Sequence, residues 1–319
     1  MKYQLASLSI AGGRASNQDR VLCEEGANAV LLVLADGLGG HAGGAFAADI
    51  LTRTAQHAFA SVRQPVITKP SAFLALTILR AHKEIVAYGQ SQKPAITPRT
   101  TCVLCLVQNG YAYWAHVGDS RLYHFRNGQV LRRTLDHTVT EQMHLEGLLT
   151  ENEMMRHPEK SRLLKAVGGS RAPIITLGEE TPLQRGDTLL LCSDGLWEAL
   201  PAAEMAKFLS GNTLEENIED MLFAAETRMQ KKADNLSAIC FRWEEGLTHA
   251  LPLQTGDEGG GDVDPGTLLG TTPRPVASAK PVKNKGARNT KTAPPEPKKK
   301  SLDDTIDELE AFLARFEKH

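Results

Sequence analysis

Short apolar runs separated by turns limit the possible folds of this chain more than any other feature. Residues 112–133 alternate between apolar and polar side chains and turn at Asn127-Gly128, the dipeptide most typical of a tight β-hairpin. Strands grouped in hairpins favour antiparallel sheets with helices packed outside them, which is an α+β class. Further strands are expected at 30–35, 100–107, 187–192 and 235–243, and helical periodicity occurs at 43–62, 71–90, 137–147, 201–210 and 213–232.

Composition divides the 319 residues into three parts. Residues 1–245 contain all three Trp and all five Tyr, so they form the folded domain. Residues 246–300 lack aromatic side chains and are rich in Pro, Gly and Lys, which predicts a disordered linker. Residues 301–319 begin with a sequence like a capping box and place apolar side chains at helical spacing. This C-terminal amphipathic helix needs a partner surface, and we expect it to bind a partner protein in trans.

Charge and cysteine content exclude several classes of function. Lys and Arg number 36 against 38 Asp and Glu, a net charge of −2, so no global field indicates binding to nucleic acid or to a membrane. No apolar run is long enough for a membrane span, and the N-terminus does not resemble a signal peptide. Five cysteines form a sparse, odd set that suits reduced thiols in a cytoplasmic protein. Cys102 and Cys105 lie in an expected strand, where their side chains would point to opposite faces, so we interpret them as core residues.

Aspartates recur where the expected strands end. Asp-Gly follows an apolar strand twice, and three further aspartates lie at comparable positions: Asp36-Gly37, Asp194-Gly195, Asp119, Asp234 and Asp19. One Asp-Gly is usually only a turn. Several carboxylates that converge on one rim of a sheet would repel each other, which raises their pKa values or requires hard divalent cations. The Gly37 carbonyl is a further candidate ligand, and the nearby Arg14 offers a planar fork suited to phosphate.

The order of these motifs carries a resemblance to a known family. The blocks RASNQD, ADGLGGHAGG, RTT, AHVGDSRLYHFRNG, DHT, KAVGG, GDTLLLCSDGLWE and DNLSA follow one another through residues 5–243. Together they resemble the bacterial form of the PPM (type 2C) metal-dependent Ser/Thr protein phosphatases. The resemblance implies a central β-sandwich of two antiparallel sheets flanked by helices, with two Mn²⁺ or Mg²⁺ ions at one end.

The resemblance also implies a role for each site residue. Asp36 is similar to the aspartate that bridges the two ions, and the Gly37 carbonyl to a ligand of one of them. Asp194 and Asp234 match the aspartates that complete the other ion's shell, and Asp119 with Asp194 matches a third, weaker site. The remaining matches are Arg14 with the arginine that binds the phosphate and Asp19 with a carboxylate that orients metal-bound water.

The implied activity is hydrolysis of phosphoserine and phosphothreonine by a hydroxide that bridges the two ions. Phosphoproteins are the implied substrates, with a bacterial Ser/Thr kinase as the opposing enzyme. Two positions depart from the pattern of many eukaryotic members. Leu38 replaces a proposed general acid, so that role stays open and His41 is one candidate; Gln18 replaces a metal-linked Glu, so one ion would be held more loosely.

Two other classes of function remain open at this stage. One is an inactive phosphatase fold that acts as a binding module, but such a protein would have lost metal-binding aspartates that this chain retains. The other is a scaffold whose C-terminal helix recruits partners while phosphatase activity is secondary. If the protein is a phosphatase, the polar stretch at about 145–170 is expected to form a flap beside the site.

Overall fold

Two antiparallel sheets form the centre of the protein in the computed structural model, which describes residues 1–38, 43–211 and 213–245. The first sheet has the strand order β1-β13-β12-β7-β8, and the second has the order β10-β6-β5-β3-β2, with β11 also paired to β6. A separate two-stranded sheet joins β4 to β9. The strands are β1 (Tyr3–Ile10), β2 (Asp19–Glu25), β3 (Ala29–Asp36), β4 (Arg99–Thr100), β5 (Cys102–Gln108), β6 (Tyr111–Val117), β7 (Arg121–Arg126), β8 (Gln129–Arg133), β9 (Val167–Gly168), β10 (Thr176–Leu177), β11 (Thr181–Pro182), β12 (Thr188–Cys192) and β13 (Leu236–Trp243).

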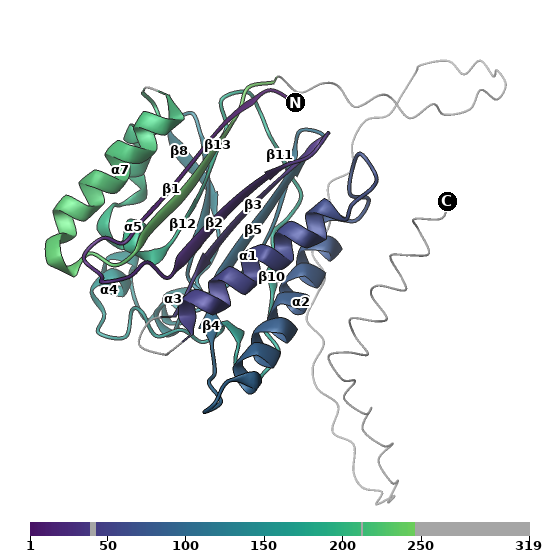
Figure 1. Cartoon of the computed structure of the whole chain (residues 1–319). Coiled ribbons are helices and arrows are strands. Elements are labelled where there is room, and N and C mark those ends of the chain that lie inside the picture. The colour runs from purple at the N-terminus through teal and green to yellow at the C-terminus, as the bar shows by residue number, and fades with distance from the viewer. Residues whose placement is uncertain (39–42, 212, 246–319) are drawn as a thin grey trace, which may run out of the picture. The chain divides into compact units, whose positions relative to one another are not determined.

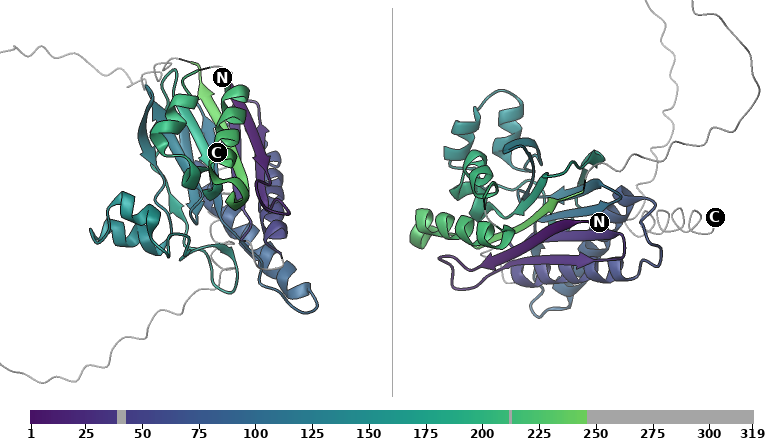
Figure 2. Two further views of the ribbon diagram at one scale, coloured as in Figure 1. Left: turned by 90° about the vertical axis from the view of Figure 1, so that its left-hand side faces the viewer. Right: turned by 90° about the horizontal axis from the view of Figure 1, so that it is seen from above.

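Helices cover the outer face of each sheet, so the protein has four layers (Figure 1). Helices α1 and α2 pack on the sheet that contains β3, and α5, α6 and α7 pack on the sheet that contains β12. The segment that carries α3 and α4 projects from this body (Figure 2). The helices are α1 (Gly44–Ala60), α2 (Pro70–Ser91), α3 (Val139–Leu145), α4 (Glu151–Arg156), α5 (Asp194–Ala199), α6 (Ala202–Phe208) and α7 (Leu214–Met229), followed by the 3₁₀ turn η1 (Gln230–Lys232).

Strand β3 shows why its sheet is buried on both faces. Leu31 and Val33 face α1 and α2, while Leu32 and Leu34 face the other sheet. A strand with apolar side chains on both faces therefore reads as one continuous apolar run, as the sequence does here. Cys102 and Cys105 on β5 divide between the same two cores and are free thiols, which confirms their interpretation as core residues.

The hairpin turns follow the local sequence. Asn127 and Gly128 join β7 to β8 with φ angles of 51° and 75°, the left-handed conformation that a type I′ turn needs. Asn109 and Gly110 make an equivalent turn between β5 and β6 with φ angles of 52° and 77°. Strands β6 and β7 do not pair, however, and belong to different sheets. The loop between them, at Gly118, crosses from one sheet to the other.

The expected fold class is confirmed, and the expected strands and helices have counterparts apart from shifts at their ends. Helices α4 and α5 were not predicted, nor were strands β1, β2, β4, β9, β10 and β11. The proposed linker at 246–300 and helix at 301–319 lie outside the described residues. Within the described part, no helix has the length and apolar character required to cross a membrane.

Candidate metal centre

The strand topology brings the predicted aspartates to one rim of the sandwich. In the sheet that contains β3, Asp36 ends β3 and lies directly opposite Asp19, the first residue of the antiparallel β2. Strand β5 runs antiparallel to β3, and β6 runs antiparallel to β5, so β6 ends at the same rim as β3. The loop after β6 carries Asp119, which therefore lies near the end of β3.

The other sheet supplies the remaining aspartates at the same end. Strand β12 finishes at Cys192, and Asp194 begins α5 two residues later. Strand β13 starts at Leu236 antiparallel to β12, so Asp234 precedes it at the rim where β12 ends. The five aspartates thus come from five separate segments that only the fold brings together.

Hydrogen bonds close this rim across the two sheets. The Asn235 side-chain oxygen accepts a hydrogen bond from the Gln18 backbone N–H at 2.9 Å, and its amide group donates to the carbonyls of Ala11 and Ser16 at 3.0 and 2.9 Å. The Ser193 backbone N–H donates to the Ser237 carbonyl at 3.1 Å. The Asn235 contacts fix the loop that contains Arg14 against the start of β13.

The carboxyl groups at this rim strongly affect each other. Burial, followed by the charges of Asp19, Asp194 and Asp119, raises the pKa of Asp36 well above its usual range. Burial and the charge of Asp119 do the same to the pKa of Asp194. The pKa of Asp119 rises to about 7, mainly because the side chain is buried. Asp36 and Asp194 nevertheless keep a solvent-accessible part, so an ion from solution can reach them. A cation would relieve this repulsion.

Buried oxygen atoms without partners also fit a cation. Both Asp19 carboxylate oxygens and the Gln18 side-chain oxygen are buried and have no hydrogen-bond partner. Burial raises the pKa of Asp19, and the Ser193 and Ser237 hydroxyls lower it in part although neither completes a hydrogen bond to it. A buried carboxylate without a partner is costly. The available donors are all oxygen atoms, which Mn²⁺ and Mg²⁺ accept and which do not form a typical zinc set.

The backbone around Asp36 is held by two threonines and requires glycine at position 37. The Thr100 hydroxyl and the Thr101 backbone N–H each donate to the Asp36 carbonyl at 2.8 Å. The Asp36 N–H donates to the Thr101 hydroxyl at 3.1 Å. A Cβ atom on Gly37 would lie 2.5 Å from the backbone of Gly44, so no other residue fits without movement.

Arg14 lies at the rim, but its side chain has a partner that the sequence did not predict. Its Nε and Nη2 atoms donate to the two carboxylate oxygens of Asp234 at 2.9 and 2.7 Å. The Arg14 side chain is 60% exposed, and three of its five N–H donors are not used in this pair. Arg14 therefore combines an anchored position with free donors that face solvent.

The aspartates do not form a finished ion site in this arrangement. Among the described residues, no three His, Cys, Asp or Glu side chains are already grouped so that they could hold a metal ion. Asp234 is directed to Arg14, and His41 lies outside the described residues. The rim therefore brings the predicted residues together without completing their geometry.

Two residues that sequence reasoning did not single out support the centre. Asn235 fixes the Arg14 loop, and an Asp-Asn pair just before a strand was the only local signal for it. Trp197 on α5 donates its Nε1–H to the Asp119 carbonyl at 2.9 Å and thereby ties the Asp119 loop to the helix that begins with Asp194. That contact joins residues 78 positions apart, and no local pattern reports it.

Comparisons with known proteins agree with this geometry. The model of the protein phosphatase 2C family matches residues 11–232. A serine/threonine phosphatase (stp) of Listeria innocua is 32% identical over 212 residues, which cover 66% of this chain and 82% of the relative. The S. agalactiae serine/threonine phosphatase has a structure similar to this one, with a TM-score of 0.69 and 28% identity over 76% of this chain and 100% of that chain.

A relative with bound metal is also similar. The catalytic domain of the phosphatase PstP, solved in complex with two manganese ions, has a TM-score of 0.64 and 25% identity over 76% of this chain and 99% of that chain. The family match covers well over half of the sequence and includes Asp19, Asp36, Asp119 and Asp194, while Asp234 lies two residues after its end. This chain therefore belongs to the protein phosphatase 2C family.

Proposed function

We propose that this protein removes phosphate from serine and threonine side chains of other proteins in a reaction that depends on divalent cations. The observation that carries the proposal is the convergence of Asp19, Asp36, Asp119 and Asp194 at one rim, where their mutual repulsion and burial call for cations. Membership of the protein phosphatase 2C family and the manganese-bound relative support the same activity.

We assign the ions to the residues expected from the sequence. Asp36 would contact two Mn²⁺ or Mg²⁺ ions, with the Gly37 carbonyl on one and Asp194 and Asp234 on the other. Asp119 and Asp194 would hold a third, weaker ion. Bound there, the cations would activate water as a nucleophile and offset the charge that develops on the phosphoryl group.

The protein's own groups would orient the substrate and the water. Arg14 would hold phosphoryl oxygens with the N–H donors that its pair with Asp234 leaves free. Asp19 is 2% exposed and faces Asp36 across the strand pair, so its carboxylate would orient water at the centre and accept a proton from it. The phosphate leaves without a covalent bond to any side chain, because the nucleophile comes from solvent.

Partners follow from the same activity. The substrates would be phosphoproteins, and a Ser/Thr kinase would be the opposing enzyme. The C-terminal segment 301–319 would recruit a protein partner through its apolar stripe, as expected from its sequence.

Phosphate release tests the proposed activity. The purified full chain should hydrolyse an aryl phosphate and a phosphothreonine peptide when Mn²⁺ is added, and EDTA should stop both reactions. Activity should return when Mn²⁺ is added in excess of the EDTA. Sustained turnover in buffer treated to remove metal, or no turnover with Mn²⁺ or Mg²⁺, would contradict the proposal.

Replacing Asp119 by Ala should separate the third ion from the other two. We expect kcat to fall about 10- to 100-fold while two ions still bind tightly, since the change removes one carboxylate but keeps the Asp119 carbonyl that Trp197 contacts. Calorimetry with Mn²⁺ measures the number of tight sites, and phosphate release measures kcat. Loss of a tight site in the Ala variant would assign Asp119 to the central pair instead.

A further inference from the structure

A basic cavity is lined by both strands of the small β4–β9 sheet, whose Thr100 supports Asp36. It has a volume of about 480 Å³ and is lined by Arg99 together with residues 164–166 and 168–174. Arg99 and Gly168 pair directly in the β4–β9 sheet, so the two parts of the lining come together through backbone pairing. The flap expected from the sequence at about 145–170 includes this lining up to Ser170 but not residues 171–174.

The charge of this cavity has one sign. Arg99, Lys165 and Arg171 contribute three cations, and no acidic side chain is among the lining residues. In the part of the chain that the structure describes, none of the three forms an ion pair. Most other arginines in the described residues pair with a carboxylate, as Arg121 does with Asp136 at 2.6 Å. Three unmatched cations around one concave surface provide a favourable potential for an anion.

The groups beneath the cavity leave this positive potential intact. His116 and His137 stack with their ring centroids 4.7 Å apart. Burial lowers the pKa of both rings, and the Lys165 charge lowers each further. For His137 the charge of His116 contributes more than that of Lys165, and the pKa falls to about 3. Nδ1 of His137 accepts a hydrogen bond from the Gly118 N–H at 3.2 Å, as a neutral ring does. Lys165 is half-buried, which limits the entropy lost when its side chain binds an anion.

Backbone contacts connect the cavity directly to the metal centre. Leu38, two residues after Asp36, donates its backbone N–H to the Arg99 carbonyl at 3.0 Å. Thr100, the next residue, donates its hydroxyl to the Asp36 carbonyl. An extended peptide advances about 3.3 Å per residue. A substrate whose phosphorylated residue is at the rim can therefore reach the cavity with a residue only a few positions away.

The rim of the cavity also offers apolar contacts. Leu164 and Ile174 are 50% and 65% exposed, although both are large apolar side chains. A peptide lying across them would bury this area and position its charged side chain over the cations. The surface thus combines an anion site with a short hydrophobic edge, as expected for recognition of a peptide segment rather than of a free ion.

From this juxtaposition of Arg99, Lys165 and Arg171 with the segment that holds Asp36, we infer that the cavity binds an acidic residue flanking the phosphorylated serine or threonine of a protein substrate. The flanking anion is a carboxylate or a second phosphoryl group, and both would accept hydrogen bonds from the two guanidinium groups. The inference rests on the proposed phosphatase function. It makes this cavity a determinant of substrate choice.

Matched peptides test the inference with the full chain and Mn²⁺. One phosphothreonine peptide carries Glu at the flanking positions, and its partner carries Gln, so the two differ in charge but hardly in shape. A third peptide carries phosphoserine at one flanking position, and mass spectrometry follows loss of phosphate from the threonine. We expect kcat/KM to be about tenfold higher for the Glu peptide than for the Gln peptide, mainly through KM. The difference should shrink at high salt.

Variants locate the preference. The double variant K165Q/R171Q should reduce the Glu-to-Gln ratio of kcat/KM to about one. The single variant K165R keeps a cation at this position and should retain most of the preference. R63Q is the matched control, because Arg63 is an exposed cation at a different cavity between α1 and α2. Thermal unfolding of each variant checks the fold.

The outcomes distinguish the inference from the function on which it rests. Hydrolysis of the Glu and Gln peptides at equal rates by the unmodified protein overturns the inference and leaves the phosphatase function standing. Failure to hydrolyse any of the peptides contradicts the function itself. A preference that survives in the double variant, or that disappears in R63Q, would place the recognition elsewhere.

Discussion

Replacing Asp36 by Asn is expected to lower kcat by at least about a hundredfold and, at the same time, to stabilise the metal-free protein. The loss of activity follows because the assigned cations would lose their shared carboxylate, and transition-state stabilisation by metal ions is worth several kcal/mol. The gain in stability follows because Asp36 lies among Asp19, Asp119 and Asp194, whose charges disfavour its ionised form. Asn has nearly the same shape but no charge to repel.

The pH dependence follows from the same repulsion. An unfolded aspartate has a pKa of about 3.9. In the folded protein the pKa values of Asp36 and Asp194 lie well above this value, and the pKa of Asp119 is about 7. The stability from these groups is complete below the unfolded pKa and is lost as pH rises through the folded pKa. The Tm of the metal-free protein should therefore fall between pH 5 and 8, less steeply in D36N.

Mn²⁺ should act in the opposite direction. Mn²⁺ that binds only the folded state raises its stability. The rise should be greatest near pH 8, because the metal binds ionised carboxylates and these form more readily as the pH rises. Scanning fluorimetry at several pH values, with and without Mn²⁺, measures both effects. D49N is a control, because Asp49 pairs with Arg53 on the surface of α1 at 2.7 Å and is not at the rim. A metal-free D36N protein less stable than the unmodified chain at pH 8 would refute this electrostatic account.

Local sequence was sufficient to predict most strands, because their signals are local. The buried run at 29–36 and the turn at Asn127-Gly128 are encoded by residues that adjoin each other. The assignment of strands to sheets is not local. Residues 112–133 read as one alternating segment, yet the chain changes sheets at Gly118, where φ is 108° and a Cβ would lie 2.7 Å from Thr101. The contact with Thr101 is a tertiary constraint that the sequence does not display.

The site likewise combines features that local sequence predicts with features that it does not. Asp36, Asp194 and Asp234 could be found from their places beside expected strands, whereas Asp19 and Asp119 were singled out from the motifs that contain them. Convergence of such carboxylates on one rim was expected. The pair between Arg14 and Asp234 joins residues 220 positions apart and could not be predicted. Helix α5 was missed because Asp194-Gly195 reads as a turn, whereas both residues belong to the short helix Asp194–Ala199, which is held by the packing of Leu196 and Trp197. The basic cavity depends on pairing of β4 with β9, two strands of only two residues each.

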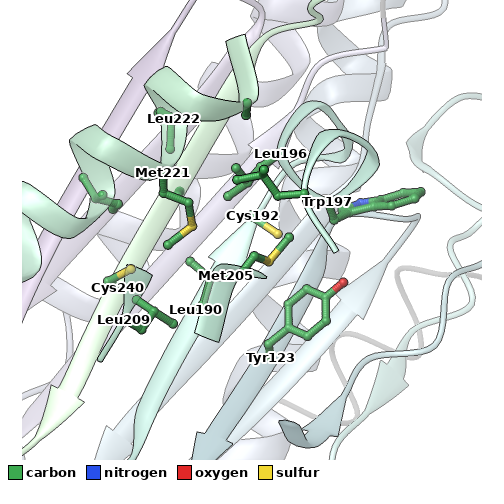
Figure 3. Close-up of a cluster of buried hydrophobic side chains, with 14 of the residues drawn as sticks. Tyr123, Leu190, Cys192, Leu196, Trp197, Met205, Leu209, Met221, Leu222 and Cys240 are labelled. Atoms are coloured by element: carbon green, nitrogen blue, oxygen red, sulfur yellow. The ribbon is translucent and has the colours of Figure 1, made fainter. Parts of the chain in front are cut away.

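A buried ion pair lies next to the metal centre, and breaking it should have a second large effect, on stability. Arg121 donates from Nε and Nη2 to the carboxylate of Asp136 at 2.8 and 2.6 Å, and from Nη1 to the Tyr123 hydroxyl at 2.8 Å. Its guanidinium carbon lies 3.6 Å from the centre of the Trp197 ring. Figure 3 shows Trp197 and Tyr123 at the edge of the apolar cluster beneath α5 and α7. The pair is almost wholly shielded from solvent, with 6% and 3% of the two side chains exposed.

Replacing Arg121 by Met should destabilise the protein by about 3–5 kcal/mol, because it leaves the Asp136 carboxylate buried without a partner. For a domain of this size, such a loss lowers Tm by roughly 6–20 °C. Urea unfolding measures the free energy. The variant should also reduce kcat, since the stacked Trp197 ring positions the Asp119 carbonyl through its Nε1–H.

A double-mutant cycle with D136L separates the charge effect from packing. If the cost of R121M comes from the unpaired carboxylate, the double variant should recover most of the stability, because a buried ion pair replaced by apolar side chains is often neutral. The exposed pair of Arg132 and Glu179, at 2.7 Å, supplies the control: R132M should cost less than about 1 kcal/mol. Equal costs for R121M and R132M would show that burial does not set the strength of this pair. Full recovery of stability with kcat still reduced would identify Arg121 as a residue that positions the Asp119 loop through Trp197, since restored packing alone cannot replace its contact with the ring.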